Sequence, residues 1–348
     1  MMSIKAATAQ VEADYAHPSS AVPSYEHELR LELTRDRIPR SDPLHSVLEH
    51  ALNVPGKLTR PTLLIESALA VGGAAGDVLP AAVGTEFGHV ASLIHDDIID
   101  HDDERRGQPA VHARYGVDTA IVAGDALIFQ LFRCLAECRK AGVADDRIVT
   151  ALEILADCGK DLCRGQQLET EIGRRRLRSL HVYLEMIELK TAALFSGACR
   201  SGAVLAGGRE EWVRALGTYG SGLGIAFQIW DDLLPYVGDP AATGKPAASD
   251  LRNRRLTLPI LLAYRNGGLS AAEVLDAALD GEITDDITLE AAVRAVEDVL
   301  RTTGAIDASA DMARGYAATA KQVLEVLPPS ASRDRLAGLA DRAVDRVS

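Results

Sequence analysis

Apolar residues recur at helical spacing along nearly the whole chain, and turn signals separate one such stretch from the next. Val54-Pro55-Gly56, Gly107-Gln108-Pro109 and Pro328-Pro329 are examples of these turn signals. Stretches in which Val, Ile and Thr alternate with polar residues are scarce, so few strands are expected. The pattern predicts helices near residues 25–37, 42–52, 59–73, 77–101, 117–140, 145–172, 179–205, 209–234, 256–266, 270–280, 288–303, 306–326 and 331–346.

These helices predict an all-α fold, a single-domain bundle of about a dozen helices over residues 25–348. Residues 1–24 are expected to form a flexible N-terminal segment, because prolines and serines crowd its last third. The rest of the chain contains neither an internal repeat nor a break in composition. The composition agrees with a helical protein, since Ala and Leu recur throughout and aromatic residues make up only 4%.

The chain is acidic, with 37 Lys and Arg against 50 Asp and Glu and a net charge of −13. Such a charge disfavours binding to nucleic acid or to an anionic membrane surface. No stretch approaches the roughly 20 uninterrupted apolar residues of a membrane helix, and none resembles a signal peptide. The five cysteines are odd in number and form no Cys-x-x-Cys pair, which is typical of reduced thiols. We therefore expect a cytoplasmic protein without a membrane span.

The sharpest local feature is an acidic turn at the end of a long apolar helix. Asp96 and Asp100 are four residues apart, so their carboxylates project from one helix face, one turn apart. Two anions held in this way favour a hard divalent cation such as Mg²⁺, which takes carboxylate oxygens and completes its shell with water and phosphate oxygens. Taken alone, the same run is equally well explained as a solvated, charged helix end.

A second acidic pair changes that balance. Asp231 and Asp232 also end an apolar helix, directly after Ile229 and Trp230, where a surface position is hard to justify. If the two helices lie side by side, their acids converge and can share a cluster of metal ions. Such a cluster would bind a diphosphate and neutralise the charge that develops as it departs.

Basic residues accompany both acidic pairs. Lys57 and Arg60 lie at a turn that leads into a helix, and Arg105 and Arg106 follow the first acidic run directly. Lys190 sits within an apolar helix, where a lysine viewed alone is better explained by snorkelling. Taken together, these acids and bases predict a site for two diphosphates.

Over roughly residues 45–347 the chain resembles the trans-isoprenyl (polyprenyl) diphosphate synthases. Asp96-Asp97-x-x-Asp100-x-x-x-x-Arg105-Arg106-Gly107 resembles the first aspartate-rich motif of that family, and Gly56-Lys57-x-x-Arg60-Pro61 resembles its upstream basic motif. The remaining matches follow in family order: His89, Gly165-Gln166, Lys190-Thr191, Phe227-Gln228, Asp231-Asp232, Gly244-Lys245, Asp250, Thr257-Leu258-Pro259 and Asp345-Arg346. The resemblance implies an isoprenoid-synthase bundle around a central hydrophobic cavity, a homodimer, and a prenyltransferase that joins isopentenyl diphosphate to an allylic diphosphate.

The resemblance also implies a role for each matching residue. Three Mg²⁺ ions would be held by the acids of the two motifs: Asp96, Asp97, Asp100, Asp231 and Asp232. The allylic diphosphate would contact Arg105, Lys190 and Lys245, and isopentenyl diphosphate would contact Lys57, Arg60, His89 and Arg106. Thr191 and Gln228 would line the place where the allylic cation forms, which makes them catalytic together with Lys190, Asp96 and Asp100. The released pyrophosphate would take the last proton.

The chain departs from the family pattern at two positions. The second motif usually ends in a third Asp, where this chain has Pro235, and Arg255 stands where a lysine is common among the substrate-binding residues. The missing acid raises the alternative of a related class I terpene synthase, which ionises an allylic diphosphate without condensation. A non-catalytic partner subunit is a further alternative. Both are disfavoured because the acids and the isopentenyl anchors are retained.

The length of the product depends on side chains below Asp96. Ala91 and Ser92 occupy the two positions where the family places a bulky residue to stop growth early, and both are small. Phe129 and Phe132, on the next helix, could close the tunnel lower down, although ordinary core packing explains them equally well. We expect geranylgeranyl diphosphate or a longer all-trans product.

The glycines at Gly220, Gly222 and Gly224 invite comparison with a nucleotide-binding loop. They lack a preceding strand and the spacing of a dinucleotide fingerprint. Close packing of helices is the better explanation, since each Gly costs about 1 kcal/mol against Ala within a helix.

Overall fold

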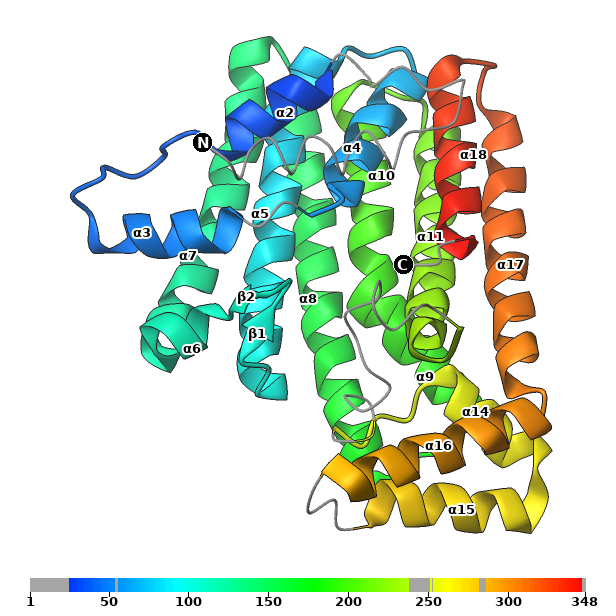
Figure 1. Ribbon diagram of the computed structural model, residues 1–348. Helices are drawn as coiled ribbons and strands as arrows, with labels where there is room; N and C mark the ends of the chain where they lie inside the picture. Colours follow the sequence, from blue (N-terminus) through cyan, green and yellow to red (C-terminus); the bar gives the residue numbers. More distant parts are fainter. Residues whose placement is uncertain (1–24, 54–55, 238–250, 252, 282–285, 346–348) are drawn as a thin grey trace. The chain divides into compact units, whose positions relative to one another are not determined.

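The computed structural model describes residues 25–53, 56–237, 251, 253–281 and 286–345 (Figure 1). The predicted flexible segment, residues 1–24, lies outside these residues, as do Lys245, Asp250 and Arg346. The chain divides into two compact units, Met1–Ile65 with Ala74–Ile148 and Glu66–Gly73 with Val149–Ser348. They are called unit 1 and unit 2 below. The prediction of a single domain with a central cavity stays a prediction.

In unit 1, one long helix packs along another, with shorter elements beside them (Figure 1). The long helices are α5 (Ala75–Asp100) and α7 (Val117–Glu137). The shorter elements are α2 (Tyr25–Leu33), α3 (Pro43–Leu52), the start of α4 (Thr59–Ala70), α6 (Val111–Tyr115) and the 3₁₀ turn η1 (Cys138–Ala141). A Cβ added at Gly84 would lie 3.0 Å from Cys134 Cβ, so glycines on α5 allow α7 to approach closely.

A two-stranded hairpin follows α5 in the chain. Strand β1 (Glu104–Arg105) pairs antiparallel with β2 (Gln108–Pro109), with Glu104 opposite Pro109. The helix ends at His101 in the left-handed conformation, φ 55°, and Arg106 and Gly107 at the hairpin turn also have positive φ, 52° and 74°. These conformations fold the chain back over the last turn of α5, because each reverses the direction of the backbone.

Unit 2 contains most of the remaining helices. Its N-terminal part holds α8 (Asp145–Arg175, which begins in unit 1), α9 (Leu180–Ile187), the π-helical turn η2 (Glu188–Ala192), α10 (Ala193–Leu205) and α11 (Glu210–Val237). Its C-terminal part holds α14 (Leu258–Asn266), α15 (Gly268–Asp280), α16 (Asp286–Thr302), α17 (Ala305–Val323), the 3₁₀ turn η3 (Leu324–Val326) and α18 (Ala331–Val344). Helix α11 packs against α10 on one side and against α17 and α18 on the other (Figure 1).

The all-α prediction is confirmed, and the observed helices follow the predicted ranges closely. Three local features were not predicted. The expected helix over 179–205 is divided by the π-helical turn η2, the hairpin β1–β2 interrupts the helices, and α6 precedes α7. The glycines of α11 serve helix packing as expected, since a Cβ at Gly220 would lie 2.7 Å from the carbonyl oxygen of Phe195.

One helix differs from the sequence expectation about membrane spans. Val117–Ala141 is long and apolar enough to cross a bilayer by length and composition, with a mean hydropathy of 1.5. Core helices of soluble proteins pass the same test, and one face of α7 is buried against α5. This helix is therefore weak evidence for a membrane span.

Candidate functional site

Unit 1 gathers the four residues that were assigned to isopentenyl diphosphate. A Cβ at Gly56 would lie 2.9 Å from the Arg106 guanidinium, which places the Gly56-Lys57 turn beside the hairpin. Desolvation, followed by the charges of Arg60 and Arg106, holds the pKa of His89 well below its usual range. The imidazole is therefore neutral at pH 7 and contributes hydrogen bonds rather than a positive charge.

A buried carboxylate lies among these cations. Glu86 is one helical turn before His89 on α5 and is only 5% exposed. Burial raises its pKa, while the nearby charges of Arg60 and Arg106 lower it. The sequence analysis missed Glu86, although a single acid within the apolar run of α5 was a usable signal. Its negative charge offsets the mutual repulsion of the two arginines, which supports a cation cluster that is ready to receive an anion.

The first acidic motif lies at the C-terminal end of α5. Asp96 and Asp100 are both half-buried and one turn apart. The helix dipole is negative at this end, which adds to the cost of placing two carboxylates there and favours a bound cation.

Asp97 has a different environment from its neighbours. It is 3% exposed, and the Nε of Arg105 donates a hydrogen bond of 2.8 Å to its Oδ1. Burial raises the pKa of Asp97, and the bond from Arg105 opposes that rise. The hairpin thus brings Arg105 back onto the helix that carries the acids, where it holds Asp97.

In unit 2, Lys190 and Thr191 lie within the π-helical turn η2. The Nζ of Lys190 is 2.5 Å from Oε2 of Glu169 on α8, and the Oγ1 of Thr191 donates a 2.8 Å bond to Oε1 of Gln228 on α11. Gly165 permits this approach, because a Cβ there would lie 2.7 Å from Lys190 Cα. The structure therefore brings together Lys190, Thr191 and Gln228, as the sequence predicted, with Glu169 as an unforeseen partner.

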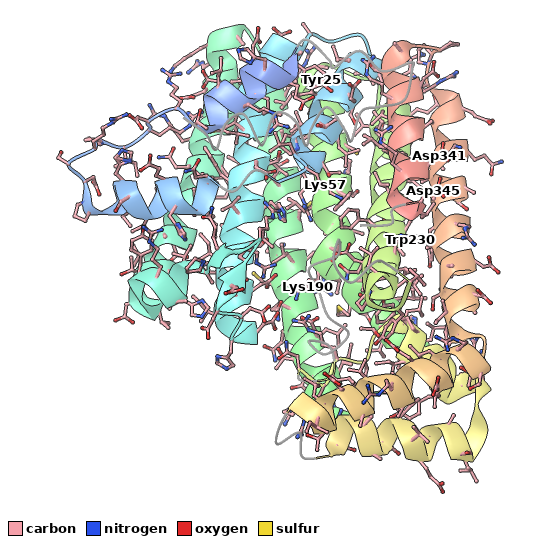
Figure 2. The ribbon with its side chains drawn as sticks, viewed as in Figure 1. Tyr25, Lys57, Lys190, Trp230, Asp341 and Asp345 are labelled. Carbon is pink, nitrogen blue, oxygen red and sulfur yellow. The ribbon has the colours of Figure 1, made fainter. Side chains whose placement is uncertain are left out.

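Asp231 and Asp232 lie on α11, one turn after Gln228 and next to the buried Trp230. The turn η2 packs against this helix, so Lys190 and Trp230 belong to adjacent elements (Figure 2). The side chain of Asp232 accepts hydrogen bonds from Gln228 and from Tyr183, a residue that the sequence analysis did not single out. Arg255, which precedes α14, is half-buried.

The four residues assigned to product length have different environments. Ala91 is 1% exposed, and Ser92 is half-buried with its hydroxyl bonded to the carbonyl of His89 on the same helix. Phe129 is 72% exposed, whereas Phe132 is half-buried. Their effect on product length stays a prediction.

The carboxylates present fit Mg²⁺ in a particular way. Among the described residues, no three His, Cys, Asp or Glu side chains come together as a ready-made metal site. Mg²⁺ is commonly held by one or two carboxylates while substrate phosphates and water complete its octahedral shell. This kind of partial coordination is available from the carboxylates of Asp96 and Asp100 together, and from Asp231 on its own.

Comparison with known proteins gives the class. Residues 41–296 match the polyprenyl synthetase family. Geranylgeranyl diphosphate synthase of Methanosarcina mazei is 36% identical over 309 residues, covering 89% of this chain and 91% of the relative. Geranylfarnesyl diphosphate synthase of Natronomonas pharaonis is 36% identical, covering 95% and 98%.

A solved structure gives the same result. Polyprenyl synthase from Caulobacter crescentus, in complex with calcium and isoprenyl diphosphate, has a TM-score of 0.81 at 33% identity and covers 92% of this chain and 94% of its own. The fold and these relatives define an all-α prenyltransferase of the isoprenoid synthase type. The chain belongs to the polyprenyl synthetase family, and it is a trans-prenyltransferase that elongates isoprenoid diphosphates.

Proposed function

We propose that this enzyme condenses isopentenyl diphosphate with an allylic diphosphate and releases pyrophosphate. The observation that carries this proposal is the cation cluster of unit 1. Arg60 and Arg106 lie near both His89 and the buried Glu86. An enzyme that only ionised an allylic diphosphate would not need this second anion site.

The two diphosphates would be held by different residues. Lys57, Arg60, His89 and Arg106 anchor isopentenyl diphosphate, which orients its double bond. Lys190, whose charge is fixed in place by Glu169, contacts the allylic diphosphate, with Arg105 and Lys245 as further contacts. Thr191 and Gln228 present oxygens near the allylic carbon, and their mutual bond fixes those oxygens in direction.

Mg²⁺ is the proposed cofactor, three ions per active site. The calcium in the Caulobacter relative supports a divalent ion, and the hard oxygen donors Asp96, Asp100 and Asp231 favour magnesium. When bound, the ions would neutralise the charge of the departing pyrophosphate.

The proposed product is geranylgeranyl diphosphate or a longer all-trans chain. Relatives named for geranylgeranyl and geranylfarnesyl products support this range, as do the small side chains at Ala91 and Ser92. The test is an incubation with Mg²⁺, isopentenyl diphosphate and each of dimethylallyl, geranyl and farnesyl diphosphate. A metal-dependent ladder that ends at one alcohol after dephosphorylation is the expected result. Hydrocarbons formed without isopentenyl diphosphate would contradict the proposal.

We further propose a homodimer formed through α7. Five apolar side chains on this helix are 36% exposed or more, and they recur at helical spacing: Val117, Ile121, Val122, Ile128 and Phe129. A second copy of the same face would remove them from water. Sedimentation of Phe129→Glu should shift toward a monomer, while Leu269→Glu, at an 84% exposed apolar residue on α15, should leave the dimer intact. Equal behaviour of the two variants would refute an α7 interface.

A cytoplasmic location is the last part of the proposal. All five cysteines are free thiols, and Cys134 and Cys138 lie one helical turn apart without forming a disulfide. Such thiols are typical of a reducing compartment. Fractionation of the source cells would test this.

A further inference from the structure

Tyr183 on α9 is a buried side chain whose hydroxyl is directed at the second acidic motif. It is 1% exposed, and its OH donates a 2.6 Å hydrogen bond to Oδ2 of Asp232 on α11. A bond of this length from a buried hydroxyl to a carboxylate is among the stronger kinds of hydrogen bond. The two residues are 49 positions apart in the chain, so only the packing of α9 against α11 joins them.

This bond is the first of three in a continuous chain. Oδ1 of Asp232 accepts a 2.9 Å bond from Nε2 of Gln228, and Oε1 of Gln228 accepts a 2.8 Å bond from Thr191. The network links α9, α11 and the π-helical turn η2. It fixes the amide of Gln228, because its nitrogen must face Asp232 and its oxygen must face Thr191. Both oxygens of Asp232 are thereby engaged within the protein.

Pro235 makes this restraint more important. A proline has no N–H, so Pro235 cannot donate the usual helical bond to the carbonyl four residues earlier, which belongs to Asp231. The same proline stands where the family's second acidic motif is expected to end in a third Asp. Metal binding by this helix therefore depends on Asp231, at a position where the helix ladder is one bond short.

We propose that Tyr183 is a positioning residue for the second metal site, acting through Asp232. The hydroxyl holds Asp232 and Gln228 in one arrangement, and this keeps the adjacent Asp231 oriented toward a metal-bound diphosphate. Asp232 then serves as a brace and not as a ligand. This inference rests on the proposed role of Asp231 in binding Mg²⁺.

The variant Tyr183→Phe removes one oxygen and keeps the ring. Tyr219 on α11 is a matched control: it is equally buried, and its OH donates a 2.6 Å bond to the backbone carbonyl of Leu336. Both variants lose one buried bond, but only Y183F loses one to the acidic motif. Both proteins should unfold at lower temperatures without ligand, and Y183F should lose more, because its bond is to a charged group.

Binding of Mg²⁺ with inorganic pyrophosphate, measured by calorimetry, separates them. Y183F should weaken this binding about tenfold and raise the Mg²⁺ concentration for half-maximal rate by a similar factor, as expected for a lost bond to a charged group. Y219F should bind within twofold of the natural enzyme. The KM for isopentenyl diphosphate should change less than twofold in both. Equal metal binding in Y183F and Y219F would overturn the proposal.

Variants of the acids test the path through Asp232. D232N should weaken binding of Mg²⁺ and pyrophosphate about as much as Y183F, and the double variant should be no weaker than either, because all three break one network. D231N should abolish it. If D232N were as severe as D231N, or if the effects of Y183F and D232N multiplied, Asp232 would be a ligand and the proposal would fail. Failure of the unmodified enzyme to consume isopentenyl diphosphate would refute the proposed function alone, since the pyrophosphate titration does not need turnover.

Discussion

Gly165 determines how closely α8 can approach the π-helical turn that carries Lys190. A Cβ at this position would lie 2.7 Å from Lys190 Cα and 2.8 Å from Lys190 Cβ, against an ordinary contact of 3.4 Å or more. The obstacle is backbone, so it cannot rotate away. The backbone nitrogen of Lys190 would lie closer still, so in Gly165→Ala the turn and α8 must separate by about 1 Å to restore ordinary contact.

The expected cost follows from two opposing effects. Overpacking a close contact costs typically 1–3 kcal/mol, while replacing a helical Gly by Ala returns about 1 kcal/mol. Gly159, on the same helix, is exposed, and a Cβ there would meet nothing within 4 Å, so Gly159→Ala should only gain. The two variants should differ by about 2 kcal/mol, which corresponds to a difference of about 3 °C in Tm for a chain of this size.

Activity should separate the variants further. A displacement approaching 1 Å at Lys190 and Thr191 should lower kcat at least tenfold in G165A, since misplacement on this scale can cost about a hundredfold. G159A should retain its kcat. The assays are thermal unfolding and release of pyrophosphate at saturating Mg²⁺. If G165A were as stable and as active as G159A, close packing at Gly165 would not be what positions Lys190.

Three further predictions follow from unit 1. Arg105→Ala should destabilise the protein by about 3–5 kcal/mol at pH 7.5, because it leaves the buried Asp97 without its cation. The loss should be smaller at pH 5, because burial raises the pKa of Asp97 and protonation removes its charge. Urea unfolding at both pH values tests this, and an equal loss would contradict it. The pKa of His89 is depressed in the folded protein, so its contribution to stability is present above the unfolded pKa of about 6.5 and is lost as the pH falls below that value. The difference in free energy of unfolding between the unmodified protein and His89→Gln should therefore decline from pH 7.5 to pH 5.5. A constant difference would refute this. Ser92→Phe should shorten the main product, because a ring at this position would block the growing chain. Ser92 is the better position for this test, since it is half-buried whereas Ala91 is fully packed. An unchanged product length in chromatography would show that the growing chain does not pass this residue.

Much of this protein was predictable because it depends on local spacing. The helices follow from apolar periodicity, and the facing carboxylates of Asp96 and Asp100 follow from their separation of four residues. The basic turn at Lys57 and the motif at Lys190 were recognisable from residue type and order. The comparisons then confirmed the family and its reaction.

The tertiary structure decided the partners of these residues. Neither the bond of Tyr183 to Asp232 nor the contact of Lys190 with Glu169 has a local signal, because each joins different helices over 49 and 21 positions. The sequence also carries no signal for the π-helical turn within the predicted helix 179–205, which packs against α9, α10 and α11. The sequence specifies which side chains can bind a diphosphate. Packing between distant segments specifies which of those side chains are fixed in one orientation by hydrogen bonds.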